Sequence, residues 1–206
     1  MAQLALCLVL LSVGALFMRG ATEAAKADPG FTFDRGVVLQ LDPSMAGYTA
    51  ERSRQIFTTA LERVRARPDV AAASVSTLMP FGELEDSQNV QRAGAPIEKG
   101  APDAAANLIE STFTGIGTGY FDALSLSLLA GRDFTSAEER TAASEPPVAI
   151  INVPLARGLF GDADPIGRTI QYSTRNPAAP PVVMTVVGLA PGIRQDLFDR
   201  EPEPQL

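Results

Sequence analysis

The first hydrophobic pattern along the chain is an uninterrupted apolar run near its start. Residues 2–18 carry no charge, and Gln3 and Ser12 are the only polar side chains among them. A run of about 17 residues is the short end of what a membrane-spanning helix needs. The run is apolar on all sides of a helix rather than along one stripe, which disfavours a helix buried in a soluble core. A membrane helix is the first interpretation.

Two other interpretations of this run stay open. A cleaved signal peptide would use Ala25-Lys26-Ala27 as its cleavage site, although no basic residue precedes the run. A soluble core helix is the third. Cys7 lies inside the run and is expected to face lipid as a small apolar residue. Arg19 follows the run, and the positive-inside tendency alone would place the rest of the chain in the cytoplasm; a start codon assigned too late would remove that argument.

The next clear pattern has the period of an amphipathic helix over residues 50–67. Its apolar positions share one stripe, namely Ile56, Phe57, Ala60, Leu61 and Val64. Thr49 can cap the helix at its start, and Glu51 in the first turn suits the helix dipole. Pro68 ends it. The arginines of this segment lie on the other faces.

Patterns typical of strands flank this helix and fill the second half of the chain. We predict strands over residues 36–41, 70–78, 108–115, 147–152, 167–172 and 182–189, and one near 88–92 within a long loop, 82–106. We predict short helices over 120–124 and 154–159, with Pro154 in a first turn, and a Pro-rich loop over 176–181. The order strand, helix, strand over 36–78 predicts a βαβ unit or a ferredoxin-like half. The fold class is therefore α+β.

Composition narrows the function classes. The chain has 206 residues, a net charge of -7 and no His or Trp. An acidic chain is not expected to bind nucleic acid, which would require a basic face. Without His, a Ser-His-Asp triad, a Cys-His pair and an imidazole metal site are all excluded. With Cys7 as the only cysteine, a disulfide within the chain is impossible.

Three groups of residues deserve inspection for chemistry, and none matches a site. Gly115-Ile-Gly-Thr-Gly119 lies between a strand and a helix, but Tyr120 stands where a dinucleotide fingerprint needs its third glycine. Asp162 and Asp164, and the acids of residues 83–86, lack the ligand spacing of a calcium loop. Residues 138–140 are typical of an exposed helical face, where local charge pairing contributes little to stability. We predict no catalytic, cofactor-binding or metal-binding residue.

The ordered motifs of the chain resemble the periplasmic core domain of MacB-like ABC transporter permeases, in the branch common in acidobacteria. The motifs are Asp28-Pro-Gly-Phe31, Gly47-Tyr48, Arg67-Pro-Asp-Val70, Gly119-Tyr-Phe121, Gly131-Arg-Asp-Phe134, Val148-Ala-Ile-Ile-Asn152, Asp164-Pro-Ile-Gly-Arg168 and Thr185-Val-Val-Gly188. Each is weak alone, and their order over nearly the whole chain is what makes the resemblance specific.

This resemblance implies a membrane helix and juxtamembrane segment over residues 1–27, followed by a mixed-sheet periplasmic core domain of βαβ-type units over 28–206. The chain would lie in the bacterial cytoplasmic membrane with its globular part outside. Val153-Pro154 and Ala190-Pro-Gly192 depart from the family pattern. Family members continue, after the point matching residues 201–206, into further core domain and three membrane helices of an FtsX-like domain, so the resemblance implies a C-terminally truncated fragment.

The function implied by the resemblance is mechanotransmission or export, driven by an ATPase. The implied partners are an ABC ATPase and a second permease copy reached through the missing membrane helices, the membrane itself, and a periplasmic protein. ATP would be bound by the ATPase, so no cofactor is expected on this chain. The alternatives are a membrane-anchored or secreted binding module without enzymatic activity and, less favoured, an enzyme, since the chain lacks the usual general base.

Overall fold

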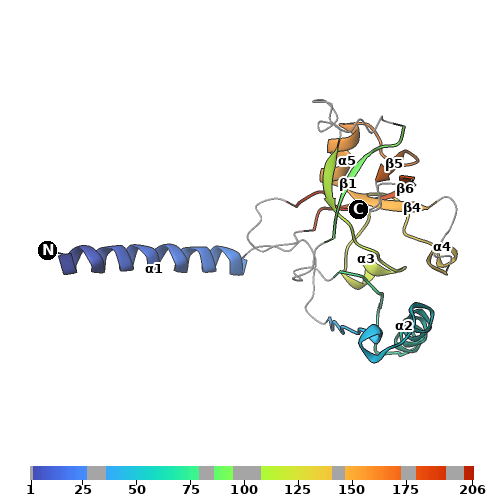
Figure 1. The fold of residues 1–206 in the computed structure, drawn as a ribbon, viewed down its shortest axis with the longest axis horizontal. Coiled ribbons are helices and arrows are strands. Elements are labelled where there is room, and N and C mark those ends of the chain that lie inside the picture. Colours follow the sequence, from blue (N-terminus) through green and yellow to red (C-terminus); the bar gives the residue numbers. More distant parts are fainter. Residues whose placement is uncertain are drawn as a thin grey trace.

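The computed structural model describes residues 2–26, 36–78, 86–94, 108–140, 147–172, 180–193 and 202–206. Its first element is a long helix, α1 (Ala2–Lys26), which projects away from the globular part (Figure 1). The helix extends about two turns beyond the predicted apolar run. No part of the apolar span is buried inside the structure. The interpretation as a soluble core helix is therefore wrong.

The described residues of the globular part form one mixed sheet of six strands: β1 (Ser87–Arg92), β2 (Ile109–Thr112), β3 (Ala130–Gly131), β4 (Val148–Asn152), β5 (Thr169–Tyr172) and β6 (Val182–Ala190). Antiparallel pairs give the order β2-β1-β5-β6-β3, and β4 pairs with β6 in parallel. The fold is thus α+β with a mixed sheet, as predicted. Five of the strands confirm predicted ones with shifted ends; the two-residue β3 was not predicted.

Strand β4 has apolar cover on both faces of the sheet. Ala149 and Ile151 belong to a core cluster that also contains Leu155, while Ile150 packs with Phe121 in a second cluster on the other face. This explains why β4 is apolar throughout, as is usual for a parallel strand buried on both sides. Strand β6 instead alternates in burial, with buried residues at every second position from Met184 to Ala190. Met184 and Val186 belong to the main cluster and Ala190 to the second, and the pairing register shifts between them.

Two short helices supply this cover. Helix α5 (Val153–Phe160) lies over the main cluster, and α3 (Tyr120–Ala123) contributes Phe121 to the second. Both confirm predicted helices. Asn152 caps α5, because its Oδ1 accepts a hydrogen bond from Leu155 N (3.1 Å). The polar residue that caps the helix is therefore Asn152, one residue before Val153-Pro154. Pro154 lies in the first turn, where its missing N–H costs little.

The last residues of the chain run between two strands of the sheet. Thr112 N donates to Pro204 O (3.0 Å), and Leu206 N donates to Thr112 O (2.9 Å), which pairs this segment with β2. On the other side, Asn152 N donates to Gln205 O (3.2 Å). Residues 204–206 therefore join β2 to the end of β4, and Leu206 packs against the main core cluster.

The region between α1 and the sheet is built differently. It comprises an extended segment (36–42), a one-turn 3-10 helix η1 (Pro43–Ala46), helix α2 (Ala50–Arg65) and a second extended segment (70–78). We call residues 36–78 the α2 module, and β1–β6 with their helices the sheet body. The predicted cap of α2 is confirmed, since Thr49 Oγ1 accepts from Arg52 N (3.3 Å), and the helix ends two residues earlier than expected.

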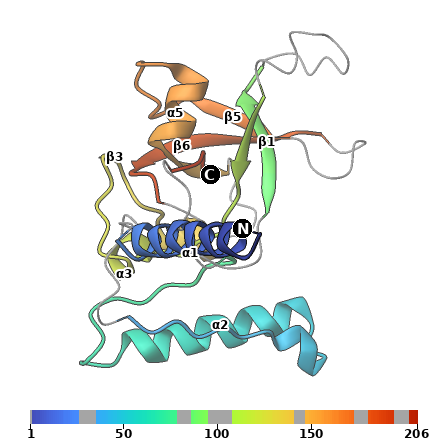
Figure 2. The same cartoon turned by 90° about the vertical axis from the view of Figure 1, so that its left-hand side faces the viewer.

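Two strands predicted in the α2 module are not formed. Residues 36–41 have no ladder, and residues 70–78 contain only one isolated bridge, between Ser76 and Ile116. Both segments run along the same side of α2 (Figure 2), in the order expected of a βαβ unit but without pairing. A strand needs hydrogen bonds from a neighbour as well as β propensity, and no described residue offers a ladder to 36–41.

Several sequence predictions fall outside the described residues. They include most of the loop 82–106 and nearly all of the loop 176–181. The boundary between residues 27 and 28 also lies there, so the division into 1–27 and 28–206 stays a prediction.

Candidate functional site

The contact between the α2 module and the sheet body is a narrow strip of hydrogen bonds, which we call the seam (residues 73–77 against 115–119). Thr77 N donates to Gly115 O (2.8 Å), and Gly117 N donates to Val75 O (2.9 Å). Ser74 Oγ adds a bond to Gly117 O (3.0 Å). The seam therefore joins the two parts largely through main-chain polar groups.

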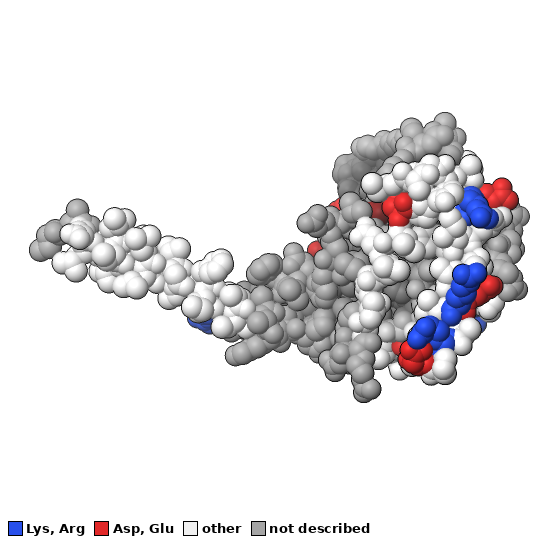
Figure 3. Space-filling view, turned by 90° about the horizontal axis from the view of Figure 1, so that it is seen from below, with Lys and Arg blue, Asp and Glu red and all other residues white. Residues whose placement is uncertain are grey.

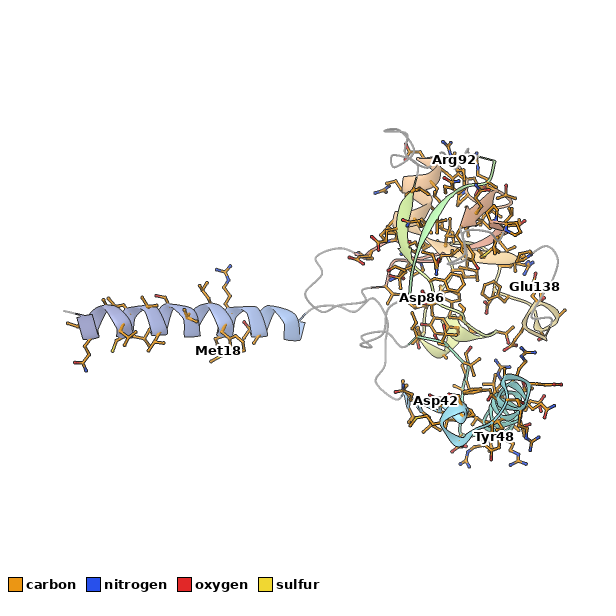
Figure 4. The ribbon with its side chains drawn as sticks, viewed as in Figure 1. Met18, Asp42, Tyr48, Asp86, Arg92 and Glu138 are labelled. Carbon is orange, nitrogen blue, oxygen red and sulfur yellow. The ribbon has the colours of Figure 1, made fainter. Side chains whose placement is uncertain are left out.

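Arg65, in the last turn of α2, ties the helix to this seam. Its Nε donates to Ala73 O (2.9 Å), and its Nη2 donates to Thr118 O (2.6 Å) and Oγ1 (3.2 Å). The Thr118 hydroxyl in turn donates to Glu139 Oε2 (2.7 Å) in α4 (Ser136–Arg140). A chain of polar contacts thus runs from α2 through residue 118 to α4. Figure 4 marks α4 by its residue Glu138.

The glycine-rich segment 115–119 is the sheet body's side of the seam. A Cβ at Gly117 would lie 2.6 Å from Glu139 Oε1 and 2.9 Å from Val75 Cγ2, so a larger residue there would displace these two side chains. Gly119 has φ +70, the left-handed region that favours glycine. Its N–H donates to Asp133 Oδ2 (3.0 Å). A phosphate-binding loop needs free N–H groups, and the N–H of Gly119 is already bonded to a carboxylate of the protein itself.

Helix α4 is held by a charged cap. Arg132 Nη2 forms an ion pair with Glu138 Oε1 (2.7 Å), and Thr135 N donates to Glu138 Oε2 (2.7 Å). These hydrogen bonds, first the one from Arg132 and then that from Thr135 N, lower the pKa of Glu138 to about 2. The charge pairing of residues 138–140 was expected to stay within an exposed helical face. Glu138 instead fixes α4 to the turn after β3, and its side chain is only 18% exposed.

Tyr120 also spans the seam. Burial raises the pKa of its hydroxyl, against the opposing effect of a hydrogen bond with Ser76. A half-buried, neutral phenol that bonds to the α2 module is a structural contact rather than an acid or base at neutral pH.

Among the acidic residues singled out in the sequence, Asp164 and Asp86 have structural partners. Asp164 Oδ1 accepts from Ile166 N (3.0 Å), and its carbonyl accepts from Arg168 Nε (2.7 Å), so it shapes the turn before β5. Residues 83–85 lie outside the described ranges. In the described part of the chain, no group of three His, Cys, Asp or Glu side chains is arranged to hold a metal.

Two shallow hollows occur on the described surface, and both open to solvent. One, of about 290 Å3, lies beside the seam and is lined by Arg65, residues 70–73, Thr118, Gly119 and Asp122. The other, of about 300 Å3, lies between α5 and the turn 161–165. Neither gathers the convergent polar groups typical of a small-molecule site.

Sequence reasoning missed the residues that organise this contact. Arg65 was assigned to the solvated faces of α2, and Glu139 to an exposed helix. Thr118 was noticed only as part of a glycine-rich segment. Residues 65, 118 and 139 are far apart in sequence, and no local pattern marks such a triplet.

The helix α1 is a candidate membrane span. Residues 3–22 form the one helix in the described ranges that is long and apolar enough to cross a bilayer, with a mean hydropathy of 2.1 over its best window. Figure 3 shows it almost entirely free of charge, in contrast to the globular part. Cys7 lies exposed on this helix, as expected of a residue facing lipid.

Comparison with known families decides what this arrangement belongs to. The model of the MacB-like periplasmic core domain matches residues 3–201. The chain belongs to this family. It is therefore a MacB-like periplasmic domain of an ABC transporter permease, with a candidate transmembrane helix at its N-terminus. The resemblance inferred from the ordered motifs is confirmed; the acidobacterial branch stays a prediction.

Two solved structures illustrate the similarity. The extracellular domain of the noncanonical ABC-type transporter YknZ from Gram-positive bacteria is 17% identical, with a TM-score of 0.43 over 71% of this chain and 59% of that one. The periplasmic region of MacB from Actinobacillus actinomycetemcomitans is 14% identical, with a TM-score of 0.43 over 72% of this chain and 53% of that one. The chain thus spans a little over half of each. Among curated proteins, none matches significantly.

Proposed function

We propose that this chain transmits movement in an ABC transporter, from membrane helices driven by a separate ATPase to an extracytoplasmic domain. The observation that carries the proposal is the junction of an uncovered apolar helix with a MacB-like periplasmic core domain. Such a domain works by changing shape or position and needs no bond chemistry of its own. The movement would serve export of a substrate or action on a partner protein.

The layout of the chain suits this role. Along the sequence, α1 is followed by the α2 module and then by the sheet body, so a displacement of α1 reaches the module first. The sheet body has a packed core, which would move as one unit because close-packed interiors resist deformation. A mechanical part needs both a rigid body and a joint, and the seam is a candidate for the joint.

The proposed partners follow from the same role. ATP would be bound by an ABC ATPase on the cytoplasmic side and not by this chain. A second permease copy and a periplasmic protein would complete the assembly, and the globular part would lie on the periplasmic side of the membrane.

The side of the membrane can be tested with one introduced cysteine. In a Cys7→Ser background, Thr59→Cys places an exposed thiol on α2. A membrane-impermeant maleimide should label this thiol in intact spheroplasts. Labelling that requires lysis would place the globular part in the cytoplasm, and a released, labelled chain without α1 would favour a cleaved signal peptide and a secreted binding module.

Transmission itself can be tested in nanodiscs that hold the permease together with its ATPase. Spin labels at Thr59→Cys in α2 and Thr169→Cys in β5, again in a Cys7→Ser background, report the distance between the module and the sheet body. We expect the distance to differ between the ADP state and the state trapped with ATP and vanadate. An identical distance in both states, with an active ATPase, would refute transmission through the α2 module.

A further inference from the structure

Among the described residues, the α2 module contributes nothing to the two core clusters of the sheet body. No residue of η1 or α2 is buried. Val37 and Leu39, in the extended segment before η1, are 92% and 76% exposed. Apolar burial is the main non-directional force that fixes one element on another. The apolar stripe of α2 is only half-buried, so the module's angle depends on directional contacts as well.

Those directional contacts are few and polar. Besides the main-chain bonds of the seam, they centre on Arg65, which bonds at once to Ala73 of its own module and to Thr118 of the sheet body. The guanidinium holds its donors in a rigid plane, so two simultaneous acceptors define a direction as well as a distance. Glu139 Oε2 in turn accepts a hydrogen bond from the Thr118 hydroxyl (2.7 Å).

The position of Arg65 gives it leverage. It lies in the last turn of a 16-residue helix, which spans about 24 Å at 1.5 Å per residue. A rotation of about 15° at that end would move the other end of α2 by about 6 Å, given this length. Residues 36–42, which lead toward α1, join the far end of α2 through η1 and run back along the helix (Figure 2).

We infer that the contacts of Arg65 with Ala73 and Thr118, backed by Glu139, form a latch that holds the α2 module at one angle on the sheet body. Opening the latch leaves the module attached through the seam and free to swing about it. Arg65 is a positioning residue in this device. The inference concerns the domain by itself and does not depend on the proposed transport role.

The glycines of the seam are consistent with a joint at this place. Gly115 and Gly117 carry no side chain that could interlock the two parts. The backbone bonds of the seam run along a single short strip, and one strip of this kind resists separation better than rotation. A latch beside the strip supplies the missing constraint.

The test uses the full chain in detergent micelles without any ATPase. Spin labels at Thr59→Cys and Thr169→Cys in the Cys7→Ser background give the distribution of distances between the module and the sheet body. We expect a single narrow distribution for the parent. Arg65→Ala should lose it, giving a broad or double distribution, while Arg63→Ala, an exposed arginine in the same turn, should keep it.

Two further variants keep the test decisive if Arg65→Ala does not fold. Thr118→Val removes the hydroxyl that links Arg65 to Glu139 and should broaden the distribution. Arg65→Lys keeps the charge but cannot hold two acceptors in one plane, so it should not restore the narrow distribution. An unchanged narrow distribution in Arg65→Ala, or in Arg65→Lys where Arg65→Ala fails to fold, would overturn the latch. Because no ATPase is present, this outcome is independent of whether transmission occurs.

Discussion

The sheet body and the α2 module are held together by different forces. In the sheet body, Val90, Leu155 and Val186 are completely buried, and buried apolar side chains occupy both faces of β4. In the α2 module, the best amphipathic helix of the chain buries none of its residues. The comparison shows that a strong helical pattern does not imply a packed element. It also implies that equal substitutions in the two parts should have unequal costs.

The sharpest test of this comparison is the same Leu→Ala substitution in both parts. Leu155→Ala in α5 should lower the free energy of unfolding by about 3–4 kcal/mol, because it empties a completely buried site. Leu61→Ala in α2 should cost about 1 kcal/mol, since that side chain is only half-buried. Urea denaturation of the full chain in micelles, followed by circular dichroism, measures both. Equal costs would mean that the module is packed as tightly as the sheet body.

Two glycines with nearly equal backbone angles extend the comparison. Gly131 has φ +77, and a Cβ there would lie 2.2 Å from Val187 O; Gly47 has φ +78 and open space around it. Gly47→Ala should cost about 1 kcal/mol from left-handed strain alone. Gly131→Ala should cost about 3 kcal/mol, because the backbone of β6 must also move. Thermal melts of the two variants would contradict this if the order were reversed.

The two helix caps should differ as well. Asn152 is buried and, besides capping α5, bonds to Glu203 O and Gln205 N. Asn152→Ala should lower the free energy of unfolding by about 2 kcal/mol, since it removes a cap and leaves its other hydrogen-bond partners without Asn152. It should also raise hydrogen exchange at residues 205–206. Thr49→Ala removes the exposed cap of α2 and should cost about 1 kcal/mol. Unchanged exchange in Asn152→Ala would show that this side chain does not hold the last segment.

The smallest expected effect is electrostatic and depends on pH. The pKa of Glu138 is about 2 in the folded protein and ordinarily 4.5, so its stabilisation is present above pH 4.5 and is lost as the pH falls toward 2. Glu138→Gln should cost about 1 kcal/mol at pH 7, after allowance for solvent screening. The difference from the parent should shrink between pH 4.5 and 2.

A matched exposed pair in the module is the control. Asp69→Asn breaks the pair with Arg67, in which both side chains are more than half exposed, and should leave the melting temperature unchanged. A difference between Glu138→Gln and the parent that is constant down to pH 2 would show that the ion pair with Arg132 is not the source of the stabilisation.

Much of the fold could be predicted from local pattern. The alternation in β6, the apolar run of β4 and the Pro154 start of α5 each predict the element that forms there. The strand over 36–41 has an equally good local pattern and does not form, because pairing depends on a neighbour that the pattern does not contain. Likewise Arg65 and Glu139 meet at Thr118 only because the seam brings α2 and α4 to one loop.

The sequence by itself determined the apolar helix, the mixed composition of strands and helices, and the family, because each depends on local periodicity or on motifs in order along the chain. Only the tertiary structure decided which elements are packed and which are merely attached. Burial and hydrogen bonding between distant residues are properties of the arrangement in space. For that reason α2 could be predicted in outline, while its dependence on Arg65 and the seam could not.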